Sequence, residues 1–226
     1  ALEGLLARAV AGVRMRVVRD GRVDAALFEA EQRAAHGLSW LATYVESLRQ
    51  MAAYGTRLST EGRFGETEAL IVRIAFGEYL AQAFGGLPMS QNEILRPADM
   101  GLTATDLAAA RTPAVEALIA DGNTAAARAA LARRIREAGG AATVGDAGLD
   151  ETMEAIRGEI RRFADAEVLP YAHAWHLAND YIPLSVIAQM AELGVFGLTI
   201  PEEFGGRGLG KGSMCVVYEE LSRAYI

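Results

Sequence analysis

The sequence predicts an all-α protein, and three of its properties carry this prediction. Alanine is abundant and β-branched residues are sparse, which favours helix over strand. Apolar residues recur three or four positions apart along most of the 226-residue chain, as in amphipathic helices. Only 6 prolines interrupt it, and its 51% hydrophobic content is that of a globular protein and not of a disordered one.

Residues 1–138 are expected to form a helical N-terminal extension. Its first three helices are predicted at 2–19, 24–54 and 66–84, with a loop at Gly55, Gly62 and Gly65. The third is apolar on nearly every side, which is typical of a central helix in a bundle, and Gly85-Gly86 resembles a glycine C-cap. A polar connector at 87–101 leads to three shorter helices, predicted at 103–110, 113–120 and 123–138.

Residues 139–149 are predicted to be a linker, because this stretch is rich in small residues and lacks hydrophobic periodicity. A second helical domain follows at 150–226. Asp150 can cap a helix that we expect to stop at Leu169-Pro170, and Pro183 opens another. Ser213 is expected to start a last helix, which reaches the end of the sequence without a cap. We therefore expect the chain to be the front part of a longer polypeptide.

Between the last two helices lies a glycine-dense loop, residues 195–212, which invites comparison with a phosphate-binding loop. A Walker A motif needs Ser or Thr directly after its Lys, and here Gly212 separates Lys211 from Ser213. Pro201 also makes the preceding residues a poor central strand, because proline cannot donate to the ladder. We therefore reject the phosphate-loop interpretation.

None of the other candidate residues indicates a catalytic or metal-binding site. Glu202 and Glu203 are adjacent, so their side chains diverge, and a solvated loop edge is the expected role. His173 and His176 could share a helix face, but no third metal ligand is evident nearby. Cys215 is expected to be a packed structural thiol. From the residues alone we assign no catalytic residue and no metal site, and the cofactor-binding residues stay unknown.

Charge and composition limit the partners. The net charge of −7 argues against nucleic-acid binding, and no apolar run approaches the roughly 18 residues of a membrane span. A single cysteine fits a reducing compartment. Lys211 is the sole lysine among 22 basic residues, a bias that we interpret as a GC-rich bacterial genome. We therefore expect a bacterial cytoplasmic protein.

Residues 150–226 also resemble a known family. The resemblance is carried by EVLPYA (167–172), MAELGVFGLTIPEEFGG (190–206), RGLG (207–210) and VVYEELSRA (216–224). These segments are similar to the N-terminal helical domain of the FAD-dependent acyl-CoA dehydrogenases. The middle β-domain and the C-terminal helical bundle of that family have no counterpart in this sequence.

The resemblance implies an enzyme that introduces an α,β double bond into an acyl-CoA thioester. In the family a glutamate removes the α-proton, FAD accepts the β-hydride, and electrons pass to electron-transferring flavoprotein. The helical extension is similar to that of the methylsuccinyl-CoA dehydrogenases of the ethylmalonyl-CoA pathway, which convert (2S)-methylsuccinyl-CoA to mesaconyl-CoA. We expect a homo-oligomer. The alternative is a non-catalytic helical module for interaction or oligomerisation.

Overall fold

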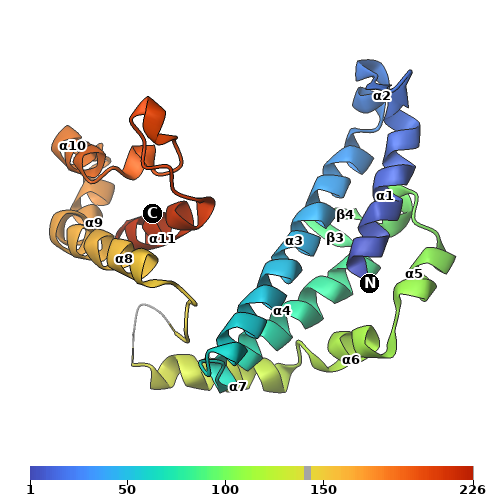
Figure 1. Cartoon of the computed structure of the whole chain (residues 1–226), viewed down its shortest axis with the longest axis horizontal. Coiled ribbons are helices and arrows are strands. Elements are labelled where there is room, and N and C mark those ends of the chain that lie inside the picture. The colour runs from blue at the N-terminus through green and yellow to red at the C-terminus, as the bar shows by residue number, and fades with distance from the viewer. Residues whose placement is uncertain (140–143, 226) are drawn as a thin grey trace. The chain divides into compact units, whose positions relative to one another are not determined.

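A computed structural model describes residues 1–139 and 144–225. The chain forms two compact units, Ala1–Asp146 (unit 1) and Ala147–Ile226 (unit 2), each built mainly of helices (Figure 1). The predicted all-α class is confirmed. The predicted boundaries 1–138, 139–149 and 150–226 stay a prediction, and Asp146, from the predicted linker, belongs to unit 1.

Unit 1 is a helical bundle around one apolar core. Helix α3 packs against α1 and α4, and α4 also contacts α6 and α7, so the predicted central position of the helix at 66–84 is confirmed. The core is formed by apolar side chains of α1, α3 and α4, together with Leu87, Leu95 and Met100. The helices of unit 1 are α1 (Leu2–Val17), α2 (Ala25–Ala30), α3 (Gln32–Thr60), α4 (Glu66–Gly85), α5 (Ala104–Ala110), α6 (Pro113–Asp121) and α7 (Ala125–Glu137).

The predicted helix at 24–54 begins where expected, with Asp24 as its N-cap, but the prediction missed a break at Glu31 and placed the end too early. The chain forms the short α2 and then α3, which continues through Gly55 to Thr60. Glycine weakens a helix by only about 1 kcal/mol, and the packing of Leu58, fully buried in the last turn, outweighs that cost. Gly55 also lies beside the ring of Phe64, from which an added Cβ would be 3.5 Å away.

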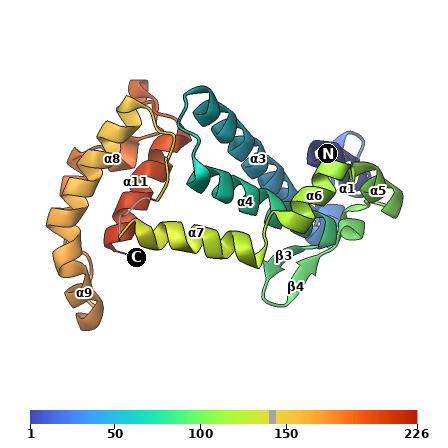
Figure 2. The ribbon, with the colours of Figure 1, turned by 90° about the horizontal axis from the view of Figure 1, so that it is seen from below.

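Two short hairpins in unit 1 were not predicted. Strands β1 (Val18–Arg19) and β2 (Arg22–Val23) pair antiparallel, as do β3 (Leu87–Ser90) and β4 (Glu93–Leu95). The second hairpin lies in the predicted polar connector, and its tip projects from the helices of the unit (Figure 2). Leu87 is paired with Leu95 at its base, and both are buried, so this pair joins the hairpin to the core. Strands this short give no periodic signal.

Gly77 on α4 is a point of close backbone approach and leads to a first prediction. A Cβ there would lie 2.5 Å from the backbone nitrogen of Asn123 and 2.8 Å from Cα of Gly122, in the turn between α6 and α7. We expect Gly77→Ala to lower the free energy of unfolding of unit 1 by about 3 kcal/mol, because backbone must move to relieve the contact.

The measurement is urea unfolding followed by the fluorescence of Trp40, in a Trp175→Phe background that leaves unit 1 with the sole tryptophan. Gly85→Ala is the matched control, because a Cβ at Gly85 at the end of the same helix meets no atom within 4 Å. Equal stability of the two variants would contradict the packing of α4 on this turn.

Unit 2 contains α8 (Glu151–Phe163), α9 (Leu169–Ala178), α10 (Leu184–Glu192) and α11 (Lys211–Ala224). Helix α8 packs against α11, and Asp150 accepts a hydrogen bond from the backbone N–H of Met153, as expected of its N-cap. The predicted stop at Leu169-Pro170 was wrong. A π-helical turn, Ala164–Val168, joins α8 to α9 and places Pro170 in the first turn of α9, where its missing N–H costs nothing.

Candidate functional site

The glycine-dense loop between α10 and α11 folds back on itself. Two 3₁₀ turns, Val195–Gly197 and Glu202–Phe204, form one limb. The returning limb donates three backbone hydrogen bonds to it: Arg207 N–H to Gly197 O (2.9 Å), Gly208 N–H to Ile200 O (2.8 Å) and Leu209 N–H to Leu198 O (2.8 Å). These bonds close residues 197–209 into a compact loop whose two limbs are hydrogen-bonded to each other.

Gly206 and Gly194 explain why the loop uses so much glycine. A Cβ on Gly206 would lie 2.0 Å from the carbonyl oxygen of Ile200 and 2.5 Å from its Cβ, so no other residue fits without moving backbone. Gly194 ends α10 with a φ of +82°, and a Cβ there would meet the guanidinium of Arg207, 2.6 Å from Nε. Glycine is therefore required by the close packing of the loop on itself.

The same bonds decide against phosphate binding by the loop. The N–H groups of 207–209 point at carbonyl groups of the other limb and are not available to a phosphate. Ser213 is fully buried, and its hydroxyl donates to the carbonyl of Gly210 at 2.8 Å. The bonding of residues 207–209 and of Ser213 therefore agrees with the rejection of the phosphate-loop interpretation. The N–H groups of 207–209 are likewise not available to the diphosphate of FAD.

A small cavity lies under the loop, between α8 and α11. Its volume is about 190 Å³, and Ile160, Val195, Leu198 and Val217 are among its lining residues. Ligand pockets are larger, roughly 300 to 1,000 Å³. The cavity is therefore a packing feature of the apolar cluster that holds the loop to the helices.

Glu220 is the one charged side chain of unit 2 that is buried among the described residues, with 1% of its surface exposed. Arg161 of α8 binds it through Nε (2.9 Å) and Nη2 (2.5 Å), and Arg223 adds a third bond at 3.0 Å. Arg223 also binds Asp165 in the π-helical turn at 2.5 Å. This Glu220 cluster (Glu220, Arg161, Arg223 and Asp165) ties α11 to α8 and the π-helical turn.

The electrostatics of the cluster keep Glu220 ionised. The hydrogen bonds from Arg161 lower the pKa of Glu220 below its ordinary value, against the opposing effect of burial. The pKa values of both arginines are raised, chiefly by hydrogen bonds to Glu220 and Asp165. A carboxylate held by two guanidinium groups at low pKa is a poor proton acceptor at neutral pH, so its role is structural.

Other residues considered from the sequence are exposed and are not brought into a site. Glu202 and Glu203 are exposed in one 3₁₀ turn, and His173 and His176 are exposed on α9. Throughout the described residues, no group of three or more His, Cys, Asp or Glu side chains could hold a metal. The expectation for Cys215 was wrong: it is exposed, because the buried face of α11 is formed by Ser213, Val216, Val217, Glu220 and Ala224.

Unit 1 has a larger hollow, an open groove of about 740 Å³ along α3, α4 and α7. Its floor is apolar, with Met51, Ile71 and Ile74 among its residues. The polar groups at its edge already bind one another, since Asn123 donates to Glu78 (2.5 Å) and accepts from Arg128 (2.7 Å). The groove therefore offers an apolar surface, and these three polar side chains at its edge are bound to one another.

Known proteins share the segment of the chain that contains the closed loop. The acyl-CoA dehydrogenase N-terminal domain family matches residues 150–226, the segment that holds α8 to α11 and the closed loop. The family resemblance is confirmed. Dehydrogenases with other named substrates match about a third of this chain. Glutaryl-CoA dehydrogenase of Desulfococcus multivorans is 34% identical over 80 residues. Isovaleryl-CoA dehydrogenase of Oryza sativa subsp. japonica is 36% identical over 76 residues. These matches cover 21% and 19% of the two relatives.

One relative aligns with the whole chain. The (2S)-methylsuccinyl-CoA dehydrogenase of Cereibacter sphaeroides is 56% identical over 225 residues, which is 100% of this chain. The helical extension is therefore shared with this relative as well as the family domain. The chain spans 40% of that relative's length.

Proposed function

We propose that this chain is the N-terminal part of a flavin-dependent acyl-CoA dehydrogenase that acts on (2S)-methylsuccinyl-CoA. One observation carries the proposal: identity of 56% to a (2S)-methylsuccinyl-CoA dehydrogenase extends along the whole chain, whereas the glutaryl-CoA and isovaleryl-CoA enzymes match only a third of it. The extension therefore supports the choice of substrate. The reaction would remove one hydrogen from each of the α and β carbons and give mesaconyl-CoA.

The part that we assign to this chain is structural. The closed loop is held by its own backbone bonds and by the apolar cluster beneath it, yet it exposes Phe196 and Phe204, at 57% and 75%. We propose that this loop shapes one side of the substrate cleft. FAD, the catalytic base and the contact with electron-transferring flavoprotein are part of the proposal but are assigned to no residue of this chain.

The remaining features of the proposal follow from the family and from the relative. We propose an acyl-CoA substrate, a homo-oligomer and a location in the bacterial cytoplasm, which the bacterial relative supports. Within residues 1–139 and 144–225, every helix is too short or too polar to cross a lipid bilayer.

The test uses the polypeptide encoded by the complete reading frame. We expect the purified protein to carry a flavin absorption band, and anaerobic addition of (2S)-methylsuccinyl-CoA to bleach it. Bleaching by isovaleryl-CoA or glutaryl-CoA but not by methylsuccinyl-CoA would overturn the substrate and keep the reaction class. A protein without flavin that no acyl-CoA alters would favour the non-catalytic helical module instead.

A further inference from the structure

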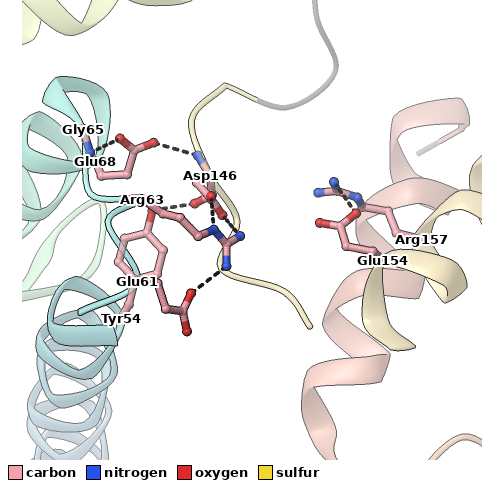
Figure 3. Close-up of polar contacts among 8 residues, drawn as sticks. All are labelled: Tyr54, Glu61, Arg63, Gly65, Glu68, Asp146, Glu154 and Arg157. Atoms are coloured by element: carbon pink, nitrogen blue, oxygen red, sulfur yellow. Dashed lines mark hydrogen bonds and ion pairs between the residues drawn. The ribbon is translucent and has the colours of Figure 1, made fainter. Parts of the chain in front are cut away.

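Asp146 fastens the chain that leads out of unit 1 to the region where α3 ends and α4 begins (Figure 3). Its backbone N–H donates to Oε1 of Glu68 at 2.7 Å, and its carbonyl oxygen accepts from the hydroxyl of Tyr54 at 2.5 Å. Both backbone polar groups of this residue are thus bound by side chains of the two long helices of the bundle.

The carboxylate of Asp146 is bound as well. Arg63 donates to it through Nε (2.8 Å) and Nη2 (2.6 Å), the two-pronged geometry that gives arginine–carboxylate pairs their strength and their directionality. The Nη1 atom of the same Arg63 binds Glu61 at 2.7 Å, outside the contact with Asp146.

The first turn of α4 supplies the side chain that accepts from the backbone N–H of Asp146. Glu68 is buried, with 5% exposed, and its second oxygen accepts from the N–H of Gly65 at 2.9 Å. Burial raises the pKa of Glu68, but the N–H donors of Asp146 and Gly65 contribute to a net lowering, so the carboxylate stays ionised as an acceptor. Gly145 has a φ of +81°, and a Cβ there would lie 2.8 Å from Oε1 of Glu68, so glycine lets the chain approach this closely.

An ordinary surface ion pair would not explain this arrangement. Arg63 and Asp146 are 40% and 27% exposed, and an exposed pair alone contributes little. Here, however, four hydrogen bonds converge on one residue, two of them to its backbone, and the glycine before it is required by the contact. Together they fix the position of the chain, which a side-chain pair alone would not do.

We propose that Gly145-Asp146 is a latch that sets the point at which the chain leaves unit 1 and thereby shortens the tether before α8. From Asp146 to the α8 cap at Asp150 there are four Cα steps, a reach of at most about 14 Å. The latch thus makes Asp146, four residues before the α8 cap, the point at which unit 1 holds the chain.

Hydrogen exchange measured by mass spectrometry on the full chain tests the latch. We expect slow exchange in the peptide covering 144–149 and an increase of about tenfold in Asp146→Ala and in Arg63→Gln, because each removes the paired contact. Glu61→Gln is the matched control: it removes the negative charge of the other residue that binds Arg63 and should leave the exchange of this peptide unchanged.

Three results would overturn the proposal. The first is exchange of 144–149 in the unaltered protein at the rate of an unstructured peptide. The second is unchanged exchange in both latch variants, or an equal increase in Glu61→Gln. The third is faster exchange throughout α3 and α4 in the latch variants, which would make Asp146 part of the unit 1 core and not a latch.

Discussion

Replacing Gly206 with alanine is expected to lower the free energy of unfolding of unit 2 by about 3 kcal/mol, because the added Cβ has no space beside Ile200. The clash is with backbone, since the Cβ would lie 2.0 Å from the Ile200 carbonyl oxygen. Relief requires the two limbs to separate, which breaks the bonds from Arg207, Gly208 and Leu209. The loop would then lose the shape that we assign to the substrate cleft.

The control for Gly206→Ala lies in the same region. Gly212 is inside α11, and a Cβ there meets no atom within 4 Å, so Gly212→Ala should stabilise unit 2 by about 0.5 to 1 kcal/mol through helix propensity. Urea unfolding followed by Trp175 fluorescence, in a Trp40→Phe background, reports on unit 2 alone. If Gly206→Ala were as stable as Gly212→Ala, the closed loop would be contradicted.

Glu220→Ala is expected to cost unit 2 about 2 kcal/mol. The substitution leaves Arg161 and Arg223 without the carboxylate that binds both. Loss of one partner of a fully buried ion pair costs about 3 to 5 kcal/mol. The two arginines are 34% and 26% exposed and can turn partly to water, so a smaller cost is expected.

The matched control is Glu159→Ala, which removes the partner of Arg162 from an exposed pair one helix position away from the cluster. We expect it to change the stability by no more than about 0.5 kcal/mol. The two variants are compared in the Trp40→Phe background by urea unfolding. Equal effects would mean that Glu220 is not held in a buried cluster.

The Glu220 cluster also sets a pH dependence. The pKa of Glu220 is lower in the folded than in the unfolded chain, where 4.5 is the ordinary value. The ionised Glu220 therefore contributes fully to the stability of unit 2 above about pH 4.5. This contribution is lost as the pH falls through the lowered pKa that Glu220 has in the folded chain. Glu220→Ala should consequently show a shallower loss of unit 2 stability below pH 4.5 than the unaltered protein.

The helices of this chain could be predicted from the sequence because their apolar residues follow a helical period over many turns. The helix at 66–84 is the clearest case, since its near-continuous apolar surface correctly indicated a central position. The two hairpins could not be predicted, because strands of two to four residues contain too few alternations to show a period. The predicted helix end at Leu169-Pro170 was wrong for a different reason. A π-helical turn before Pro170 allows the chain to continue as a helix past this proline.

The site was less predictable than the helices. The glycines of 205–212 signalled unusual backbone, but the sequence did not show that Gly206 packs on Ile200. Glu220 carries a signal that was overlooked: it follows Val216 and Val217 by four and three residues, so it falls on their helix face. Asp146 carries no such signal, because its partners Tyr54, Arg63 and Glu68 are distant in sequence and meet it only in the folded unit.

The most direct test of the proposed function is the mass of the product. The complete polypeptide is incubated with (2S)-methylsuccinyl-CoA and an artificial electron acceptor, and the thioester is analysed by mass spectrometry. We expect a product that has lost two hydrogen atoms and co-elutes with mesaconyl-CoA, formed faster than the corresponding products of isovaleryl-CoA and glutaryl-CoA. A thioester of unchanged mass with all three substrates, from a folded and flavin-loaded protein, would contradict the proposed function.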